Sequence, residues 1–117
     1  MTDPTPDVLD VLQVLRARIN AEPVGRIDTA ALAAAAHLDG HELHRFLHVH
    51  LRVTPVQFVR HHRLDAVHRV IQAGDVDPSV AARDWGFVHL RRFTDAYIER
   101  HGHSPAETVA AAADGEY

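Results

Sequence analysis

Residues 77–108 have the sequence DPSVAARDWGFVHLRRFTDAYIERHGHSPAET, and this stretch decides the fold class. Asp77 can cap a helix that begins at the following proline, a residue that suits the first helical position. Gly86 ends that short helix, and a longer helix should run from about residue 88 to residue 101, before a second glycine. Ala82 supplies the small side chain needed where two such helices cross. The stretch therefore predicts a helix-turn-helix unit.

The same pattern occurs about fifty residues earlier in the chain. A short alanine-rich helix is expected at residues 29–36, with Asp28 as its cap. A longer helix is expected at residues 40–51, where Asp39 and Glu42 form a capping box. The apolar side chains expected to bury the two longer helices are Leu43, Phe46, Leu47 and Leu51 in the first copy and Leu90, Phe93 and Tyr97 in the second.

A further helix is expected before the first copy. Thr5 is its expected cap and Pro6 its first residue. Its apolar side chains recur at helical spacing and form one stripe: Val8, Val11, Leu12, Leu15 and Ile19. The helix should stop at the Glu22-Pro23 pair.

A long helix is expected between the two copies. Thr54 and Gln57 form a second capping box around Pro55, and the helix should reach about residue 73. Its apolar side chains do not keep to one stripe, which is typical of a helix that contacts two separate lobes. A third capping box, at residues 104–107, starts a final alanine-rich helix.

These elements together predict an all-α fold of seven helices, in which a long central linker helix joins two helix-turn-helix subdomains. At 117 residues, one domain over residues 1–117 is the simplest organisation. Its expected parts are a first helix-turn-helix at about 27–53, a linker helix at about 55–73, a second helix-turn-helix at about 77–102 and a final helix at about 105–113.

The composition limits the possible functions. The formal net charge is −4, whereas a nucleic-acid binder is usually basic. Five of the acids lie near the ends of the chain, at Asp3, Asp7, Asp10, Asp114 and Glu116. Without them, eleven acids remain against twelve arginines, so the central part is close to neutral. The chain has no cysteine for a disulfide or a thiolate metal site and no apolar run long enough to span a membrane, so we expect a cytoplasmic protein.

The outer faces of the two longer helices carry the candidate DNA-binding residues. In the first copy these are His41, His44, Arg45, His48 and Arg52, and in the second they are His89, Arg91, Arg92, Thr94 and Asp95. In a major groove, arginine can pair with guanine, and histidine or threonine can contact base edges or phosphates. The alternative is that these side chains form an ordinary solvated face of an αα-hairpin, but two tandem copies favour DNA binding.

The second copy carries a spaced set of residues: Ala82, Gly86, Phe87, Phe93 and Tyr97, followed by Gly102, Ser104, Pro105 and Glu107. In these residues it resembles the AraC/XylS family of transcription regulators. The first copy and the linker match through Leu43, Arg45, Val53, Thr54, Pro55, Phe58, Arg63 and Leu64. The resemblance covers roughly residues 27–109. It implies sequence-specific binding to double-stranded DNA, with the two longer helices in successive major grooves.

The resemblance also implies which residues contact DNA. The base-contacting residues it implies are His41, His44 and Arg45 in the first copy and Leu90, Arg91 and Asp95 in the second. Arg63 on the linker helix is a candidate phosphate contact. Many members of the family carry a separate effector-binding domain, for which 117 residues leave no room, so the sequence fits a stand-alone regulator or an excised domain.

Three positions depart from the family pattern. Arg52 replaces a glycine, and an arginine in a left-handed cap costs about 1 kcal/mol, so the helix before it is expected to run on or to end differently. Ala81 replaces a larger apolar residue, which is expected to loosen the second copy. Asp95 places a carboxylate where the family often has a cation or an amide. A carboxylate can accept a hydrogen bond from cytosine, but beside phosphates it more often repels.

Other function classes have weaker support. His44 and His48 have a spacing that can bind zinc, with His41 on the same face, but no further ligand completes a set. We therefore predict no metal site and no cofactor. The sequence contains no nucleophile elbow or phosphate-binding loop, so we do not expect an enzyme. The alternative function is a protein-interaction module that contacts an RNA polymerase subunit or another regulator, with weak or assisted DNA binding.

Overall fold

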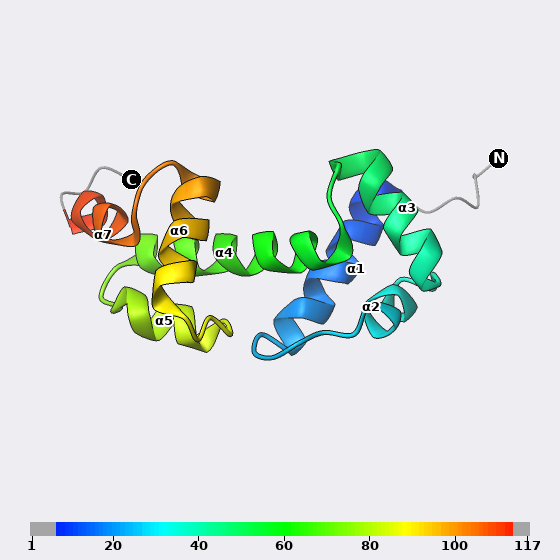
Figure 1. The fold of residues 1–117 in the computed structure, drawn as a ribbon, viewed down its shortest axis with the longest axis horizontal. Coiled ribbons are helices and arrows are strands. Elements are labelled where there is room, and N and C mark those ends of the chain that lie inside the picture. The colour runs from blue at the N-terminus through cyan, green and yellow to red at the C-terminus, as the bar shows by residue number, and fades with distance from the viewer. Residues whose placement is uncertain (1–6, 114–117) are drawn as a thin grey trace. The chain divides into compact units, whose positions relative to one another are not determined.

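The computed structural model describes residues 7–113, which form seven α-helices and no strands (Figure 1). The helices are α1 (Val8–Ala21), α2 (Thr29–Ala35), α3 (Gly40–Leu51), α4 (Pro55–Ala73), α5 (Pro78–Asp84), α6 (Leu90–His101) and α7 (Pro105–Ala113). The expected all-α class and the expected order of seven helices are confirmed. Within the described range, no helix is both long enough and apolar enough to cross a lipid bilayer.

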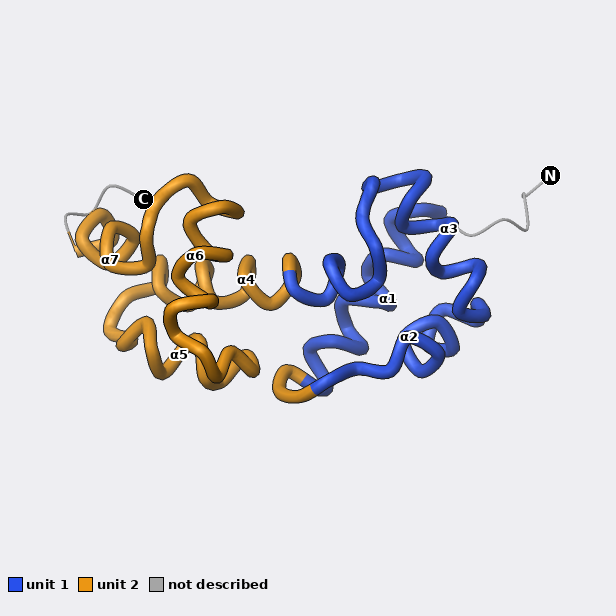
Figure 2. Tube along the Cα trace, viewed as in Figure 1, with its two compact units in different colours: residues 1–22, 26–60 blue, residues 23–25, 61–117 orange. Residues whose placement is uncertain are grey.

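The chain divides into two compact units, and the boundary falls inside α4 (Figure 2). In the described range, unit 1 consists of residues 7–22 and 26–60, and unit 2 of residues 23–25 and 61–113. Each unit therefore holds one copy of the short helix, turn and longer helix, together with one part of α4, the shorter part in unit 1.

Short-range capping explains where most helices begin. The carboxylate of Asp28 accepts a hydrogen bond from the N–H of Ala30, at 3.2 Å, as expected for an N-cap. The predicted capping boxes are all present, because in each pair the side chain of one residue accepts from the backbone N–H of the other. The distances are 2.7 and 3.0 Å for Asp39 with Glu42, 3.1 and 2.9 Å for Thr54 with Gln57, and 3.1 and 2.9 Å for Ser104 with Glu107.

Two helix starts differ from the sequence-based expectation. Thr5 and Pro6 lie outside the described residues, and the N-cap of α1 is Asp7, whose carboxylate accepts from the N–H of Leu9 at 3.2 Å. The second longer helix begins at Leu90 and not at residue 88, with His89 as an N-cap that makes no side-chain cap hydrogen bond. The expected start at about residue 88 is therefore two residues too early, because the extended backbone of His89, with φ −108° and ψ 97°, keeps it and Val88 out of the helix.

The core of unit 1 is formed by the predicted apolar faces of α1, α2 and α3. Its buried members are Val11, Leu12, Leu15, Ile19, Leu32, Ala33, Leu43, Leu47 and Phe58. Leu51, expected in this core, is 39% exposed. Each step of four residues drifts about 40° around an α-helix, so the row from Leu43 through Leu47 has turned by roughly 80° when it reaches Leu51, out of the buried face.

The core of unit 2 is formed by the second half of α4 with α5 and α6. Its buried members are Leu64, Val67, Ile71, Ala81, Ala82, Phe93 and Tyr97. Phe58 and Val59, near the start of α4, belong instead to the core of unit 1. The prediction that the linker helix contacts two separate lobes is thus confirmed, because its apolar side chains divide between the two cores.

Leu90 was expected in the core of unit 2, but it is 51% exposed. It is the first residue of α6. Helical side chains tilt toward the N-terminus of their helix, so a side chain at the first position projects beyond the start of the helix and away from Phe93 and Tyr97. The expectation that Leu90 is buried is therefore wrong.

Arg52 ends α3 in the left-handed conformation, with φ 59° and ψ 34°. Its N–H donates to the carbonyl oxygen of His48 at 3.1 Å, and the N–H of Val53 donates to that of Leu47 at 3.4 Å. The expectation that α3 runs on past this point, or ends differently, is wrong. The Thr54-Gln57 capping box starts the next helix only two residues later, and it fixes the reversal at Arg52 despite the strain.

Candidate nucleic-acid interface

The outer face of α3 carries the expected residues of the first copy. Four of them project from one side of the helix and are exposed: His41, His44, Arg45 and His48. At about 100° per residue, they fall within an arc of roughly 100°. Leu43 and Leu47 occupy the opposite, buried side. The core of unit 1 therefore determines which side of α3 faces outward.

Two further exposed residues adjoin this face of α3. Arg52 lies at the C-cap, where its left-handed backbone starts the turn toward α4. Val49 is 57% exposed and lies about 40° around the helix from Arg45. Sequence reasoning missed Val49, because an isolated apolar residue carries no signal that it is exposed.

The outer face of α6 has the same register as that of α3. Adding fifty to a residue number on α3 gives its counterpart on α6, since Leu43 becomes Phe93 and Leu47 becomes Tyr97, both of them buried. By this rule the counterparts of His41, His44, Arg45 and His48 are Arg91, Thr94, Asp95 and Ile98. The repeat places the two candidate faces at equivalent positions of two equivalent helices.

The α6 face differs from the α3 face in its chemistry. Leu90, Arg91 and Asp95 are exposed, whereas Thr94 is half-buried and its hydroxyl donates to the Leu90 carbonyl oxygen at 2.9 Å. Ile98, 43% exposed, was missed by sequence reasoning, although the fifty-residue register could have found it. The face thus combines one guanidinium, one carboxylate and apolar side chains, where α3 presents one guanidinium and imidazoles.

The remaining expected residues lie beside these faces. His89 is exposed at the N-cap of α6. Arg92 is exposed, but it has the register of Glu42, about 100° around the helix from Arg91. Arg63 is half-buried on α4. The structure does not bring Arg63 onto the outer face of α6, so its role as a phosphate contact stays a prediction.

The arrangement suits contact with a DNA groove. The major groove is about 12 Å wide and admits one α-helix, whose outer side chains can then contact base edges. An exposed arginine can donate two hydrogen bonds to a guanine, and exposed imidazoles can contact phosphates or bases. Within residues 7–113, no three histidine, aspartate or glutamate side chains are grouped so that they could hold a metal ion.

A family model described as a helix-turn-helix domain matches residues 32–111. The chain belongs to the AraC/XylS family of helix-turn-helix domains. The residues that carried the resemblance have clear roles in the fold: Ala82, Phe93 and Tyr97 are buried in the core of unit 2, and Gly86 and Gly102 have positive φ values of 87° and 81°.

Characterised relatives come from Pseudomonas putida. The chain is 28% identical over 90 residues to the XylDLEGF operon transcriptional activator, an alignment that covers 71% of this chain and 27% of that protein. It is 26% identical over 87 residues to XylDLEGF operon transcriptional activator 2, covering 72% of this chain and 55% of that protein. The chain therefore spans only about a quarter to a half of these relatives.

Solved structures share the fold. A probable AraC family transcriptional regulator from Rhodopseudomonas palustris aligns with a TM-score of 0.70 at 22% identity, covering 88% of this chain and 97% of that one. An AraC-type transcriptional regulator from Chromobacterium violaceum aligns with a TM-score of 0.78 at 18% identity, covering 90% and 94% of the two chains. At these identities the likeness supports the helical fold alone.

Proposed function

We propose that this AraC/XylS family member binds a specific site on double-stranded DNA and regulates transcription, with α3 and α6 in successive major grooves. The observation that carries the proposal is the repeat itself. Two helices of equal length, each the second helix of a helix-turn-helix, turn the same register positions outward, as at Arg45 and Asp95. Two recognition helices on one chain suit two half-sites about one helical turn of DNA apart.

The α3 face is the one expected to supply most of the affinity. Arg45 is placed to pair with a guanine, and His41 and His44 to contact neighbouring base edges or phosphates. His48 and Arg52 lie nearer the C-terminal end of the helix and are the expected phosphate contacts. With no acid among these five residues, the α3 face gains the most from the negative potential of DNA.

The α6 face is expected to contribute more to selectivity than to affinity. Arg91 can pair with guanine, whereas Asp95 can accept a hydrogen bond from the amino group of cytosine. Leu90 is exposed and can contact a thymine methyl group. Because a carboxylate repels phosphates, sites without a matching cytosine should be disfavoured at this half-site.

The proposal is tested by selecting bound fragments from a random DNA pool and measuring binding to the selected site and to random DNA. Arg45→Ala should weaken binding to the selected site by about 1–3 kcal/mol, or about 5- to 140-fold, and relax the preference at one base position. Arg26→Ala is the matched control, because Arg26 is an exposed arginine of unit 1 that lies before α2 and outside the α3 face.

Three results would count against the proposal. An equal loss on selected and random DNA for Arg45→Ala would show that Arg45 does not contact a base. An equal loss for Arg45→Ala and Arg26→Ala would show that only net charge matters. A failure to enrich any sequence from the pool would favour a protein-interaction module over a sequence-specific regulator.

A further inference from the structure

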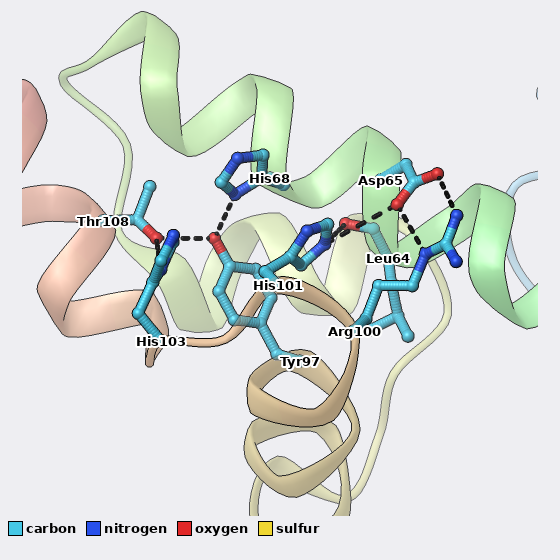
Figure 3. A network of polar contacts seen from close by, with 8 residues as sticks. All are labelled: Leu64, Asp65, His68, Tyr97, Arg100, His101, His103 and Thr108. Atoms are coloured by element: carbon cyan, nitrogen blue, oxygen red, sulfur yellow. Dashed lines mark hydrogen bonds and ion pairs between the residues drawn. The ribbon is translucent and has the colours of Figure 1, made fainter. Parts of the chain in front are cut away.

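Three imidazoles gather on the polar side of the core of unit 2 (Figure 3). His68 lies on α4, His101 is the last residue of α6, and His103 lies in the loop before α7. The rings of His68 and His101 are stacked, with centroids 4.2 Å apart and planes 12° apart. The ring centroid of His103 is 5.6 Å from that of His68.

A chain of hydroxyl groups ties this cluster to the core. The Nδ1 atom of His68 lies 2.6 Å from Tyr97 Oη, which lies 2.7 Å from Thr108 Oγ1. The Thr108 hydroxyl lies 3.0 Å from His103 Nδ1 and donates to the Ser104 carbonyl oxygen at 3.2 Å. Tyr97 and Thr108 are fully buried, so their hydroxyl groups depend on these partners. The chain joins α4, α6 and α7 (Figure 3).

The direction of these hydrogen bonds determines which nitrogen of His68 can take up an added proton. When Thr108 gives its proton to Ser104, the Tyr97 hydroxyl donates to Thr108, because each hydroxyl has only one proton to give. Tyr97 then accepts from the Nδ1–H of His68. In this arrangement a neutral His68 carries its proton on Nδ1, and its Nε2 atom takes up the next one.

The charged groups around the stack offer little free negative charge to balance added protons. Asp65 on α4 lies 3.7 Å from His101 Nε2, but both of its oxygens are already bonded by Arg100 of α6, at 2.9 Å each. The other charged groups near the stack are Arg69 on α4, His103 before α7, and Glu107 on α7, whose carboxylate accepts from the N–H of Ser104. Two cationic rings stacked at 4.2 Å would face Arg69 and Arg100, and the acids of the described residues near them are Asp65, already bonded by Arg100, and Glu107, whose carboxylate caps α7.

The local environment disfavours the charged form of both rings. Burial lowers the pKa of His68, and the neighbouring His101 and His103 lower it further, against the opposing effect of Asp65. Burial also lowers the pKa of His101, while its contacts with the Leu64 carbonyl and with Asp65 act in the opposite direction.

We propose that the His68–His101 stack makes unit 2 sensitive to acid: when both rings take up protons, the repulsion between them separates α4 from α6 and loosens the packing of α6. The consequence for DNA, loss of contact at the half-site of α6, rests on the proposed function. The Tyr97 side chain is the link to the recognition face, because it is buried beneath α6 and its hydroxyl is bonded directly to His68.

The sign of the effect follows from proton binding. An unfolded histidine titrates near pH 6.5, and the folded pair holds protons less tightly, so below that pH the unfolded state binds more protons. Stability is therefore full above about pH 6.5. It falls as the pH drops from there toward the lowered pKa values of His68 and His101.

The test follows thermal unfolding of the full chain between pH 7.5 and 5.5 by the fluorescence of Trp85. Trp85 is the only tryptophan and packs against the core of unit 2. The midpoint should fall over this range, because the folded state binds protons less tightly at both rings than the unfolded state does. In His101→Phe, which keeps a ring against His68 but cannot titrate, the fall should be clearly smaller.

The matched control is His50→Phe. His50 is an exposed histidine of unit 1 whose ring centroid lies 4.6 Å from that of Phe46. This variant should keep the pH dependence of the unmodified chain. An equal pH dependence in the unmodified chain and in His101→Phe would overturn the proposal.

A second measurement does not depend on the folding of any variant. In an NMR titration of the unmodified chain, the ring protons of His68 and His101 should titrate at lower pH than free histidine, near 6.5. Titration of both rings at or above that pH would also overturn the proposal.

These measurements contain no DNA, so they separate the two proposals. If the Trp85 midpoint falls with acid as expected but no DNA is bound at any pH, the acid-sensitive stack stands and the proposed function fails. If DNA is bound specifically but the midpoint and the ring titrations show no effect, the proposed function stands and the stack is only structural.

Discussion

Units 1 and 2 have the same arrangement of helices, but different kinds of side chain hold the helices together. At three register positions, unit 1 has Leu47, Val53 and Phe58, and the residues fifty further on in unit 2 are Tyr97, His103 and Thr108. The first set belongs to the hydrophobic core of unit 1, whereas the second set is joined by hydrogen bonds of 2.7 and 3.0 Å. A helix-turn-helix can therefore be closed by mainly apolar packing or by a polar network, and we expect only the second to make its stability depend on proton binding.

The outward faces show the reverse distribution of histidine. On α3 the imidazoles of His41, His44 and His48 are exposed, whereas on α6 the same positions hold Arg91, Thr94 and Ile98. The histidines of the α3 face are therefore exposed, whereas His68 and His101 of unit 2 stack on each other and contribute to its fold. Acid should therefore strengthen the binding of DNA by the α3 face of unit 1 but lower the stability of unit 2.

The largest expected effect is on the apolar cores, where the units should behave alike. Phe93→Ala removes a buried ring from unit 2 and should cost about 3–5 kcal/mol of unfolding free energy, while Leu43→Ala at the matching position of unit 1 should cost about 2–5 kcal/mol. Chemical denaturation followed by Trp85 fluorescence and by circular dichroism measures both. A cost below about 1 kcal/mol for Phe93→Ala would show that unit 2 is not held together by this core.

A smaller loss of unfolding free energy should show what the polar network of unit 2 contributes beyond apolar packing. Tyr97→Phe leaves the ring in place but removes the hydroxyl between His68 and Thr108, so it should cost about 1–3 kcal/mol. Thr94→Val is the control, because the Thr94 hydroxyl bonds only to a carbonyl of its own helix and should be worth less. Equal costs for the two variants would mean that the network adds nothing to a local hydrogen bond.

Substitutions at the ends of α3 and α6 should change the unfolding free energy by about 1 kcal/mol, upward in one unit and downward in the other. Arg52 and Gly102 are register partners, and both have positive φ, at 59° and 81°. Arg52→Gly should therefore stabilise unit 1 by about 1 kcal/mol, and Gly102→Ala should destabilise unit 2 by a similar amount. Denaturation midpoints measure both changes. A destabilised Arg52→Gly would show that the arginine side chain compensates for the strain of its backbone.

The smallest expected effect concerns the exposed histidines. Phosphates favour the protonated form of a nearby imidazole, so binding should take up protons and affinity should rise as the pH falls from 7.5 to 6.5. Each added phosphate contact should steepen the slope of log affinity against log salt by about 0.9. Replacing His41, His44, His48 and His89 by glutamine should remove both changes, whereas His50→Gln should not. A flat affinity in the unmodified chain would show that these imidazoles do not approach phosphates.

Local chemistry explains how much of the fold was predictable from the sequence. The capping boxes at Asp39 and Thr54 depend on residues three positions apart, so the sequence displays them directly. Leu51 and Leu90 were misassigned to the core, because hydrophobicity does not show where along a helix the core stops. The sequence shows the strain of an arginine in the left-handed cap at Arg52, but not that α3 ends there all the same, at the turn into the next helix.

The histidine stack was not predictable, because its contacts span long stretches of sequence. Tyr97 is 29 residues from His68, and the His101 contact with the Leu64 carbonyl spans 37 residues. No short motif encodes such pairs. Helix periodicity and the fifty-residue register together predict which residues lie on the candidate DNA faces. The register finds more of them, because it identifies the exposed Ile98 as the counterpart of His48.

The central claim is that α3 and α6 contact two separate half-sites, and footprinting of the selected DNA tests it most directly. The account predicts two protected regions about 10 base pairs apart on one side of the duplex. Arg45→Ala should weaken protection of one region and Arg91→Ala that of the other, each leaving its neighbour largely protected. A single protected region, or the loss of one and the same region in both variants, would contradict the account.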